Sequence, residues 1–301
     1  MENNLNPGRR KFIATTLKAT GATLVAGIPA LTMAVDQATT ALTVQDVINI
    51  ILKEIPGAPF ADTVDTIKSG NNDQRVTGIV TTMFATINVI KETARLNANF
   101  IIAHEPTFYN HADDKGWVAK NEILKKKEEL LKLYDIAVWR FHDYWHTIRP
   151  DGILTGVLKM ANWQQYSQPG EPVFRIPATS LKNIVEHLRN SLHISHVRVI
   201  GDLQQKCERI AVMPGAAGGQ RQISLVENES PDVLIVGEVH EWETAEYIRD
   251  AIALGSKTAL IILGHSVSEE PGMQWLVEWL QPKVPAIKVN HISSGDPFTW
   301  I

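Results

Sequence analysis

An imidazole and a carboxylate lie four residues apart in the segment Gly-His-Ser-Val-Ser-Glu at 264–269. The preceding run at 259–263 is apolar and too short for a buried helix, which is typical of a strand covered on both faces. Ser268 is a good N-cap for a helix that follows this strand. His265 and Glu269 would then lie at the carboxyl end of a strand, where open α/β sheets hold their ligands. These residue types at that place predict a metal site.

The same placement of histidine recurs along the chain. One His-x-x-x-Glu pattern specifies little and, taken alone, is more typical of a capping or surface arrangement. Five of the ten histidines, however, follow an apolar run directly or after one small residue: His104, His142, His240, His265 and His291. Core or solvated histidines would not be expected to collect at one topological position. Several strand ends are therefore expected to converge on one site.

Apolar periodicity predicts the elements that must position these residues. In the first part of the chain it predicts helices over 42–55, 86–96, 121–134 and 152–162, and strands over 75–84, 99–103 and 136–141. After a Gln-, Pro- and Gly-rich joint at 164–172 it predicts helices over 181–192, 222–227, 242–254 and 271–280, and strands over 173–176, 197–200, 209–213, 233–236 and 259–263.

These predicted elements form an internal repeat. The order strand, helix, strand, His104, helix, strand, His142 is matched by the same order ending in His240 and His265. Repetition at this length indicates duplication rather than a solenoid. We therefore predict an α/β fold with two similar α/β halves, 35–165 and 166–301, that face each other across a metal-binding cleft.

Composition restricts the function classes. With 301 residues and a net charge of −4, the chain can bury a sizeable core and shows no nucleic-acid footprint. The single cysteine, Cys207, excludes an internal disulfide. No run after residue 34 is long enough to span a bilayer, for which about 20 apolar residues are needed.

The first 34 residues are expected to be an export signal. Residues 6–13 contain Arg9-Arg10 and resemble a twin-arginine signal, and a mildly apolar stretch rich in Ala, Thr and Gly follows. A membrane anchor and a frayed helix are the alternatives, but Lys18 and several Gly and Thr make a weak spanning helix. A periplasmic or otherwise exported protein is the expectation.

Four segments together resemble one known family: Phe100–Pro106, Phe141–His146, Val236–Glu238 and Gly264–Glu269. These segments are similar to motifs of the NGG-interacting-factor-three-like family of dinuclear metal-centre proteins, whose members often carry the name GTP cyclohydrolase type 2. The likeness extends from Leu42 to Ile301. It implies a pair of metals between two α/β halves and subunits assembled as a ring-shaped homo-hexamer.

The resemblance also implies a set of metal ligands. His104, His265 and Glu269 match the family's motif. Glu105 stands where the family has the second residue of a His-His pair, and His146 stands where it has Asp. Both replacements can bind a divalent metal, so the ligand count is kept. The Asp that is lost could bridge two metal ions, so the chain could hold either one ion or two. The donor types suit zinc, iron or manganese.

Hydrolysis is the reaction that such a centre favours, since bound divalent metals activate water. Glu238 and His240 are the candidate catalytic residues for proton transfer or substrate orientation, with a supporting role as the alternative. His142 is interpreted as a supporting residue and His291 as structural. The glycine-rich turn at 214–219 does not fit a phosphate loop.

We predict a metal-dependent hydrolase of an unknown small-molecule substrate. The alternative is a non-catalytic metal-binding ring that serves as a scaffold or store. A nucleoside triphosphate would be scarce outside the cytoplasm and no strong phosphate-binding motif is present, so a substrate other than GTP is expected.

Overall fold

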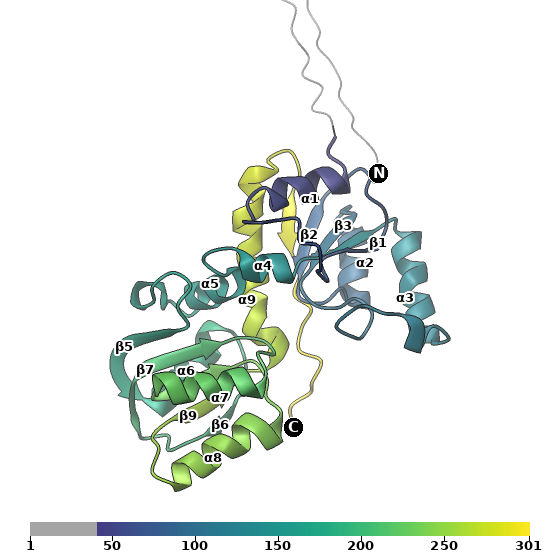
Figure 1. Cartoon of the computed structure of the whole chain (residues 1–301). Coiled ribbons are helices and arrows are strands. Elements are labelled where there is room, and N and C mark those ends of the chain that lie inside the picture. Colours follow the sequence, from purple (N-terminus) through teal and green to yellow (C-terminus); the bar gives the residue numbers. More distant parts are fainter. Residues whose placement is uncertain (1–40) are drawn as a thin grey trace, which may run out of the picture. The chain divides into compact units, whose positions relative to one another are not determined.

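The computed structural model describes residues 41–301, which form one compact unit by themselves (Figure 1). The predicted export signal at 1–34 lies outside the described residues. Two five-stranded sheets with helices make up residues 41–301, so the predicted α/β class with two halves is confirmed. Within that range no helix is both long and apolar enough to cross a membrane.

The first sheet is mostly parallel and has the strand order β1-β4-β3-β2-β10. Its strands are β1 (Ile67–Ser69), β2 (Ile79–Thr82), β3 (Phe100–Ala103), β4 (Ala137–Arg140) and β10 (Val289–His291). Only β1, at the edge, is antiparallel to its neighbour. The helices of this half are α1 (Val44–Leu52), α2 (Ile87–Arg95) and α3 (Glu122–Leu133). Because β3 and β4 pair in parallel and end level, the residues that follow them emerge at one edge of the sheet.

The second sheet has the order β5-β7-β8-β9-β6. Its strands are β5 (Val173–Ser180), β6 (Arg198–Ile200), β7 (Lys206–Met213), β8 (Val233–Val236) and β9 (Ala259–Ile262). The central three strands are parallel, and the two edge strands are antiparallel to them. The helices that accompany this sheet are α6 (Leu181–Ser191), α7 (Gly219–Glu229) and α8 (Glu246–Ala253).

The two halves repeat the same unit. The order β2-α2-β3-α3-β4 in the first half corresponds to β7-α7-β8-α8-β9 in the second. Each unit has an antiparallel strand beside its last strand, β1 beside β4 and β6 beside β9. The sheets differ at the other edge, where β10 is parallel to β2 and β5 is antiparallel to β7. The shared order is the one that the sequence repeat predicted, and it supports an internal duplication.

Both faces of the central strands are buried. In β3, Phe100 and Ile102 pack in a cluster with α1, while Ile101 and Ala103 pack in a separate cluster with α2 and α3. Alternate residues of a strand point to opposite faces, so a strand covered on both sides must be apolar throughout. This explains why continuous apolar runs, rather than alternating ones, predicted these strands correctly.

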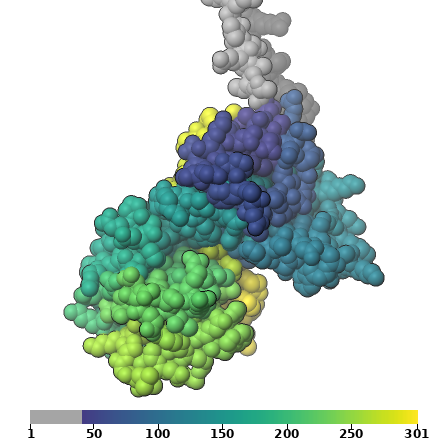
Figure 2. All heavy atoms as spheres, in the orientation of Figure 1, coloured from purple at the N-terminus to yellow at the C-terminus, as the bar shows by residue number. Residues whose placement is uncertain are grey.

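The chain returns to the first half after β9. Helix α9 (His265–Leu280) packs against α5 (Gly152–Met160) and β2, and β10 then pairs with β2. The space-filling view shows the yellow C-terminal region beside the purple region of α1 (Figure 2). The predicted boundary between residues 165 and 166 stays a prediction, and the last strand completes the first sheet.

The predicted start of the helix after β9 is wrong. Helix α9 begins at His265 rather than after Ser268, because Gly264 adopts a φ of 105° and turns the chain directly into the helix. Ser268 lies inside the first turn, where its hydroxyl donates to the His265 carbonyl at 2.7 Å and accepts from the Gly215 amide at 2.9 Å. His265 and Glu269 therefore share one face of the helix, one turn apart.

Candidate metal centre

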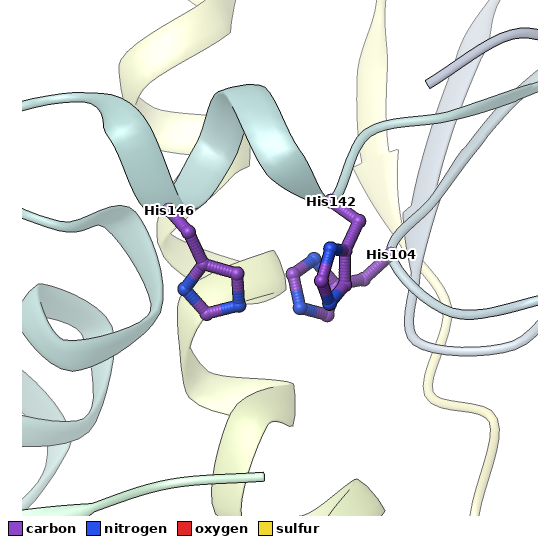
Figure 3. A group of neighbouring side chains, drawn as sticks. All are labelled: His104, His142 and His146. Carbon is purple, nitrogen blue, oxygen red and sulfur yellow. The ribbon is translucent and has the colours of Figure 1, made fainter. Parts of the chain in front are cut away.

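Three imidazoles gather at the carboxyl ends of β3 and β4 (Figure 3). His104 directly follows β3. His142 is the N-cap residue of the short helix α4 (Asp143–Thr147), and His146 lies within this helix, four residues later. The ring centroids are 4.8 Å apart for His104 and His142, 5.0 Å for His104 and His146, and 4.9 Å for His142 and His146. One nitrogen of each ring lies within 4.8 Å of the others, so the three could hold a metal ion.

Two buried carboxylates adjoin these imidazoles. His104, Glu105 and Glu269 form a second group that could hold an ion, and all three side chains are buried. Glu269 Oε2 lies 3.6 Å from His104 Nε2 and 3.1 Å from His265 Nε2. Its other oxygen, Oε1, lies 3.9 Å from His146 Nε2. Glu105 Oε1 lies 3.3 Å from His265 Nε2.

The structure thus brings together the five residues proposed as ligands from the sequence: His104, Glu105, His146, His265 and Glu269. It also places His142, interpreted from the sequence as a supporting residue, among the candidate ligands. We call these six side chains the His/Glu cluster. Two close-packed glycines, Gly156 of α5 and Gly272 of α9, let the helices that flank the cluster approach each other, since a Cβ on Gly156 would lie 2.5 Å from Gly272 Cα.

Each imidazole of the cluster is oriented through its Nδ1 atom. The partners are the Phe141 carbonyl for His104 at 3.1 Å, Asp143 for His142 at 2.8 Å, Asp151 for His146 at 2.9 Å and Glu238 for His265 at 3.2 Å. A carbonyl or carboxylate accepts from Nδ1, so the lone pair of a neutral ring lies on Nε2; at His265, Nε2 carries a proton until a cation replaces it. Imidazoles that bind metals are normally held in this way.

Asp65 holds the segment that carries two of these imidazoles. Its carboxylate accepts from the backbone amides of His142 at 2.7 Å, Asp143 at 3.2 Å and Tyr144 at 2.8 Å. These are free amides of the first turn of α4, which an acceptor must satisfy. Sequence reasoning missed Asp65, because it lies 77 residues before His142. Asp151 had a local signal, since it precedes a helix and caps α5 through the Leu154 amide at 2.9 Å.

The electrostatic state divides the imidazoles into two pairs. Burial lowers the pKa of His104 well below its ordinary value and also lowers the pKa of His142, so both rings are neutral. Burial opposes the charge of His146 and His265 as well, but neighbouring carboxylates outweigh it. Asp151 raises the pKa of His146, and Glu105, Glu238 and Glu269 raise the pKa of His265 to about 12. In the metal-free protein a proton on His265 balances the carboxylates.

An orphaned atom shows that the residues fit a cation. The Nε2 atom of His104 is buried and makes no hydrogen bond within residues 41–301. A buried nitrogen with a free lone pair is costly unless it has a partner, and a divalent cation is such a partner. The mixed imidazole and carboxylate donors suit zinc, iron or manganese.

Glu238 and His240, proposed from the sequence for catalysis, lie in different surroundings. Glu238 is half-exposed, and its carboxylate contacts His265 of the cluster. His240 is 60 % exposed, lies 3.3 Å from Glu243 and stacks on Trp242. The structure records no contact between His240 and the cluster among the described residues.

Two further features flank the cluster. His291, interpreted as structural, lies outside it and contacts Thr81 at 3.1 Å and Glu270 at 2.8 Å. The glycine-rich turn at 214–219 packs directly on a cluster residue, since a Cβ on Gly215 would lie 2.0 Å from Glu269 Oε1. This turn therefore serves as the wall behind the Glu269 carboxylate.

Comparisons with known proteins agree with this architecture. A model of the Duf34/NIF3 (NGG1p interacting factor 3) family matches residues 42–297. A protein from Clostridium perfringens named "GTP cyclohydrolase 1 type 2 homolog" is 22% identical over 272 residues, which cover 85% of this chain and 98% of that protein. One of the same name from Clostridium acetobutylicum is 23% identical over 263 residues, or 83% of this chain and 93% of that protein.

Solved structures show the same fold. Staphylococcus aureus protein SA1388 matches with a TM-score of 0.70 at 19% identity, over 87% of this chain and 100% of that one. A Bacillus cereus protein related to NIF3 matches with a TM-score of 0.69 at 17% identity, over 86% of this chain and 99% of that one. The family resemblance inferred from the four sequence segments is confirmed.

Proposed function

This chain belongs to the Duf34/NIF3 (NGG1p interacting factor 3) family, and on that premise we propose that it is a metal-dependent hydrolase of a small molecule. The observation that carries the proposal is the orientation of four imidazoles, each held at Nδ1, around two buried carboxylates. Histidines with a purely structural role do not require the same orientation of their Nε2 atoms. A site that binds a cation requires it, because the Nε2 atoms are the ligands.

The six residues of the His/Glu cluster would hold the metal. When bound, a divalent cation supplies Lewis-acid chemistry, which makes water a stronger acid and stabilises negative charge on a reacting oxygen. Three of the ligands, His104, Glu105 and Glu269, are buried and shielded from water, whereas His142, His146 and His265 are partly exposed. Their burial also strengthens the electrostatic interactions within the site.

Glu238 is positioned for proton transfer at the open side of the cluster. Its Oε2 atom accepts from His265 Nδ1 at 3.2 Å, which lowers the pKa of the carboxyl and keeps it ionised. The other oxygen makes no hydrogen bond within residues 41–301 and can accept a proton from a water molecule or a substrate group. We propose His240 for substrate orientation only, because its ring is exposed beside Trp242 and away from the ligands.

The donor set is compatible with one ion or with two ions per chain. The two candidate ligand groups, His104/His142/His146 and His104/Glu105/Glu269, are not independent. Both groups include His104. Its Nε2 has a single lone pair, so it binds one ion only. A second ion would depend on Glu269, whose two oxygens face different imidazoles, Oε1 toward His146 and Oε2 toward His265. Elemental analysis in atoms per chain decides between the two stoichiometries.

The surroundings of the glycine-rich turn favour a substrate other than a nucleoside triphosphate. The start of α7 could offer free amides to a phosphate. The Gly219 amide, however, donates to the carboxylate of Glu243 at 3.1 Å. A negative charge at that position repels an anionic substrate. The name of the clostridial relatives, GTP cyclohydrolase 1 type 2 homolog, is compatible with hydrolysis without fixing the substrate here.

We also propose export by the twin-arginine route and assembly as a homo-hexamer. Export depends on Arg9-Arg10 in the sequence, and an intact N-terminus on protein recovered from the cytoplasm would contradict it. The hexamer depends on the family likeness. Light scattering that gives the mass of a monomer at working concentration would exclude it.

The decisive experiment compares turnover and metal content in the same samples. Metal-loaded protein is assayed on a panel of phosphoesters, amides and cyclic nucleotides, alongside His265→Ala and the control His196→Ala. His196 is exposed, contacts Ser195 and Trp300 and lies outside the cluster. We expect turnover that His265→Ala abolishes and His196→Ala keeps. Tight metal binding without turnover across the panel would favour the metal-binding scaffold instead.

A further inference from the structure

Arg140 is a fully buried cation directly behind the His/Glu cluster. It is the last residue of β4, two residues before His142, and its side chain is 0 % exposed. A buried guanidinium is costly unless its donors and its charge are satisfied. The residues that accept hydrogen bonds from this guanidinium therefore indicate which part of the site it positions.

Within residues 41–301, the partners of the Arg140 guanidinium lie in the loop 104–113, which begins with two cluster residues. Arg140 Nε donates to the His104 carbonyl at 3.2 Å, and Nη1 donates to the His111 carbonyl. Its Nη2 lies 3.5 Å from Glu105 Oε2, and Nη1 lies 3.6 Å from Asp113 Oδ2. The planar guanidinium thus connects both ends of the loop, as a point charge such as Lys could not.

Glu105 divides its two oxygens between Arg140 and the cluster. Oε2 faces the guanidinium, while Oε1 lies 3.3 Å from His265 Nε2 and 3.8 Å from His142 Nε2. Only Oε1 is therefore directed at the metal position. The carboxylate is held as a ligand through one oxygen, and the other oxygen is already engaged.

The pairing also accounts for the charge at this position. The family likeness expects a neutral imidazole where Glu105 stands. A carboxylate and a guanidinium together have no net charge, so Arg140 balances the negative charge that Glu105 adds at this position. With His at position 105, Arg140 would keep only Asp113 as an anionic partner, and Asp113 is shared with Lys68 at 3.3 Å.

We propose that Arg140 is a positioning residue of the metal centre, which holds Glu105 by Oε2 so that Oε1 alone serves as a ligand, and that residues 105 and 140 are interdependent. The inference rests on the proposed metal centre and not on hydrolytic activity. It assigns a role to a buried side chain that the proposed chemistry does not otherwise use.

The test is a cycle of variants in which Zn²⁺ is titrated into the metal-free full-length protein by calorimetry. Arg140→Met and Glu105→His are each expected to weaken Zn²⁺ binding by about 10- to 100-fold. The double variant is expected to bind more tightly than Glu105→His alone, because it no longer buries a cation that has lost the Glu105 carboxylate beside a neutral ring and the bound metal. A merely structural Arg140 predicts the opposite order, since its loss would add to the damage.

Two further variants separate positioning from general stability. Lys127→Met removes another buried cation of the same region, whose Nζ donates to the Thr107 carbonyl at 2.6 Å, and should change Zn²⁺ affinity less than threefold. Arg140→Lys keeps the charge without the planar fork and should bind with intermediate affinity. Binding equal to the unaltered protein in Arg140→Lys, or a loss in Lys127→Met as large as in Arg140→Met, would overturn the proposal.

The melting temperatures of the metal-free variants test the pair independently. Glu105→His/Arg140→Met should melt above Glu105→His, and the reverse order would refute the interdependence even if Zn²⁺ is not the native metal. Failure of the unaltered protein to bind Zn²⁺ or Mn²⁺ would instead refute the proposed function. The two failures are therefore distinguishable.

Discussion

The glycine-rich turn offers a direct test of Glu269 as a ligand. Gly215 has a φ of 67°, and a Cβ at this position would lie 2.0 Å from Glu269 Oε1 and 2.5 Å from its Cδ. Ordinary contact begins at 3.4 Å, so in Gly215→Ala the carboxylate must move by about 1.4 Å, the difference 3.4 − 2.0. Glu269 is 3 % exposed and is packed among His104 and His265, so it cannot move without leaving the cluster.

The same turn contains a matched control. Gly218 has a φ of 83°, and nothing lies within 4 Å of a Cβ built on it. A positive φ is unfavourable for alanine at both positions and costs about 1–3 kcal/mol. Gly218→Ala carries this backbone cost alone, whereas Gly215→Ala adds the displacement of a ligand. The difference between the two variants isolates the effect on the metal centre.

We expect Gly215→Ala to weaken Zn²⁺ binding by at least 10- to 100-fold, equivalent to about 1.4–2.8 kcal/mol, and Gly218→Ala to change it less than threefold. Calorimetric titration of the metal-free proteins measures both affinities, and chemical denaturation measures the shared backbone cost. Equal Zn²⁺ affinity in the two variants would show that the position of Glu269 does not matter to metal binding. The assignment of this carboxylate as a ligand would then fail.

Three further predictions concern the residues that orient the cluster. Asp65→Ala leaves three backbone amides of the turn at His142 without their acceptor. Chemical denaturation should show a free energy of unfolding lower by about 3 kcal/mol, and a decrease below about 0.5 kcal/mol would contradict this. Asp151→Asn keeps the cap of α5 but weakens the hold on His146 Nδ1, so Zn²⁺ affinity should fall about tenfold while the melting temperature stays constant. Because the pKa of His265 is raised to about 12, its ring must lose a proton when a metal binds. Zn²⁺ affinity should therefore rise by up to about tenfold per pH unit between about pH 6 and 8. Calorimetric affinities that do not change with pH would exclude this linkage.

The raised pKa of His265 also fixes the sign of its effect on the metal-free protein. Its folded value lies above the ordinary value of 6.5, so the protonated ring stabilises the fold in full below about pH 6.5. That contribution then declines progressively as the pH rises from about 6.5 to about 12. Metal binding should therefore become more favourable over a range of pH in which the metal-free fold is losing the support of this proton.

Most of the elements were predictable because their signals are local, whereas the short strand β1 and the short helix α4 were not predicted. The run Phe100–Ala103 is apolar at every position, since it is covered on both faces, and the strand follows from that run alone. The same holds for Val233–Val236 and Ala259–Ile262 in the second sheet. Histidines at the ends of such strands then pointed to the edge where His104, His142 and His265 meet.

The rest of the site depends on contacts between distant segments, which one sequence does not display. Asp65 supports the turn at His142 from 77 residues away. Gly215, which follows β7, lies against Glu269, which follows β9. The start of α9 was misplaced for a related reason. Serine is a residue type favoured at the N-cap, but the Ser268 hydroxyl accepts a hydrogen bond from the Gly215 amide. This tertiary contact outweighs the local preference.

Helix α9 explains why ligands from the two halves meet. Its first turn follows β9 of the second sheet and provides His265 and Glu269, while Met273 and Leu276, one and two turns later, are buried in the core of the first half. The helix is thus anchored by hydrophobic burial in the half that carries His104 and His146. A ligand pair at the start of a rigid, buried helix loses little conformational freedom when it binds a cation. The positions of Glu269 and His265 are therefore determined by the packing of α9 before any metal arrives, which is the condition for a preorganised centre.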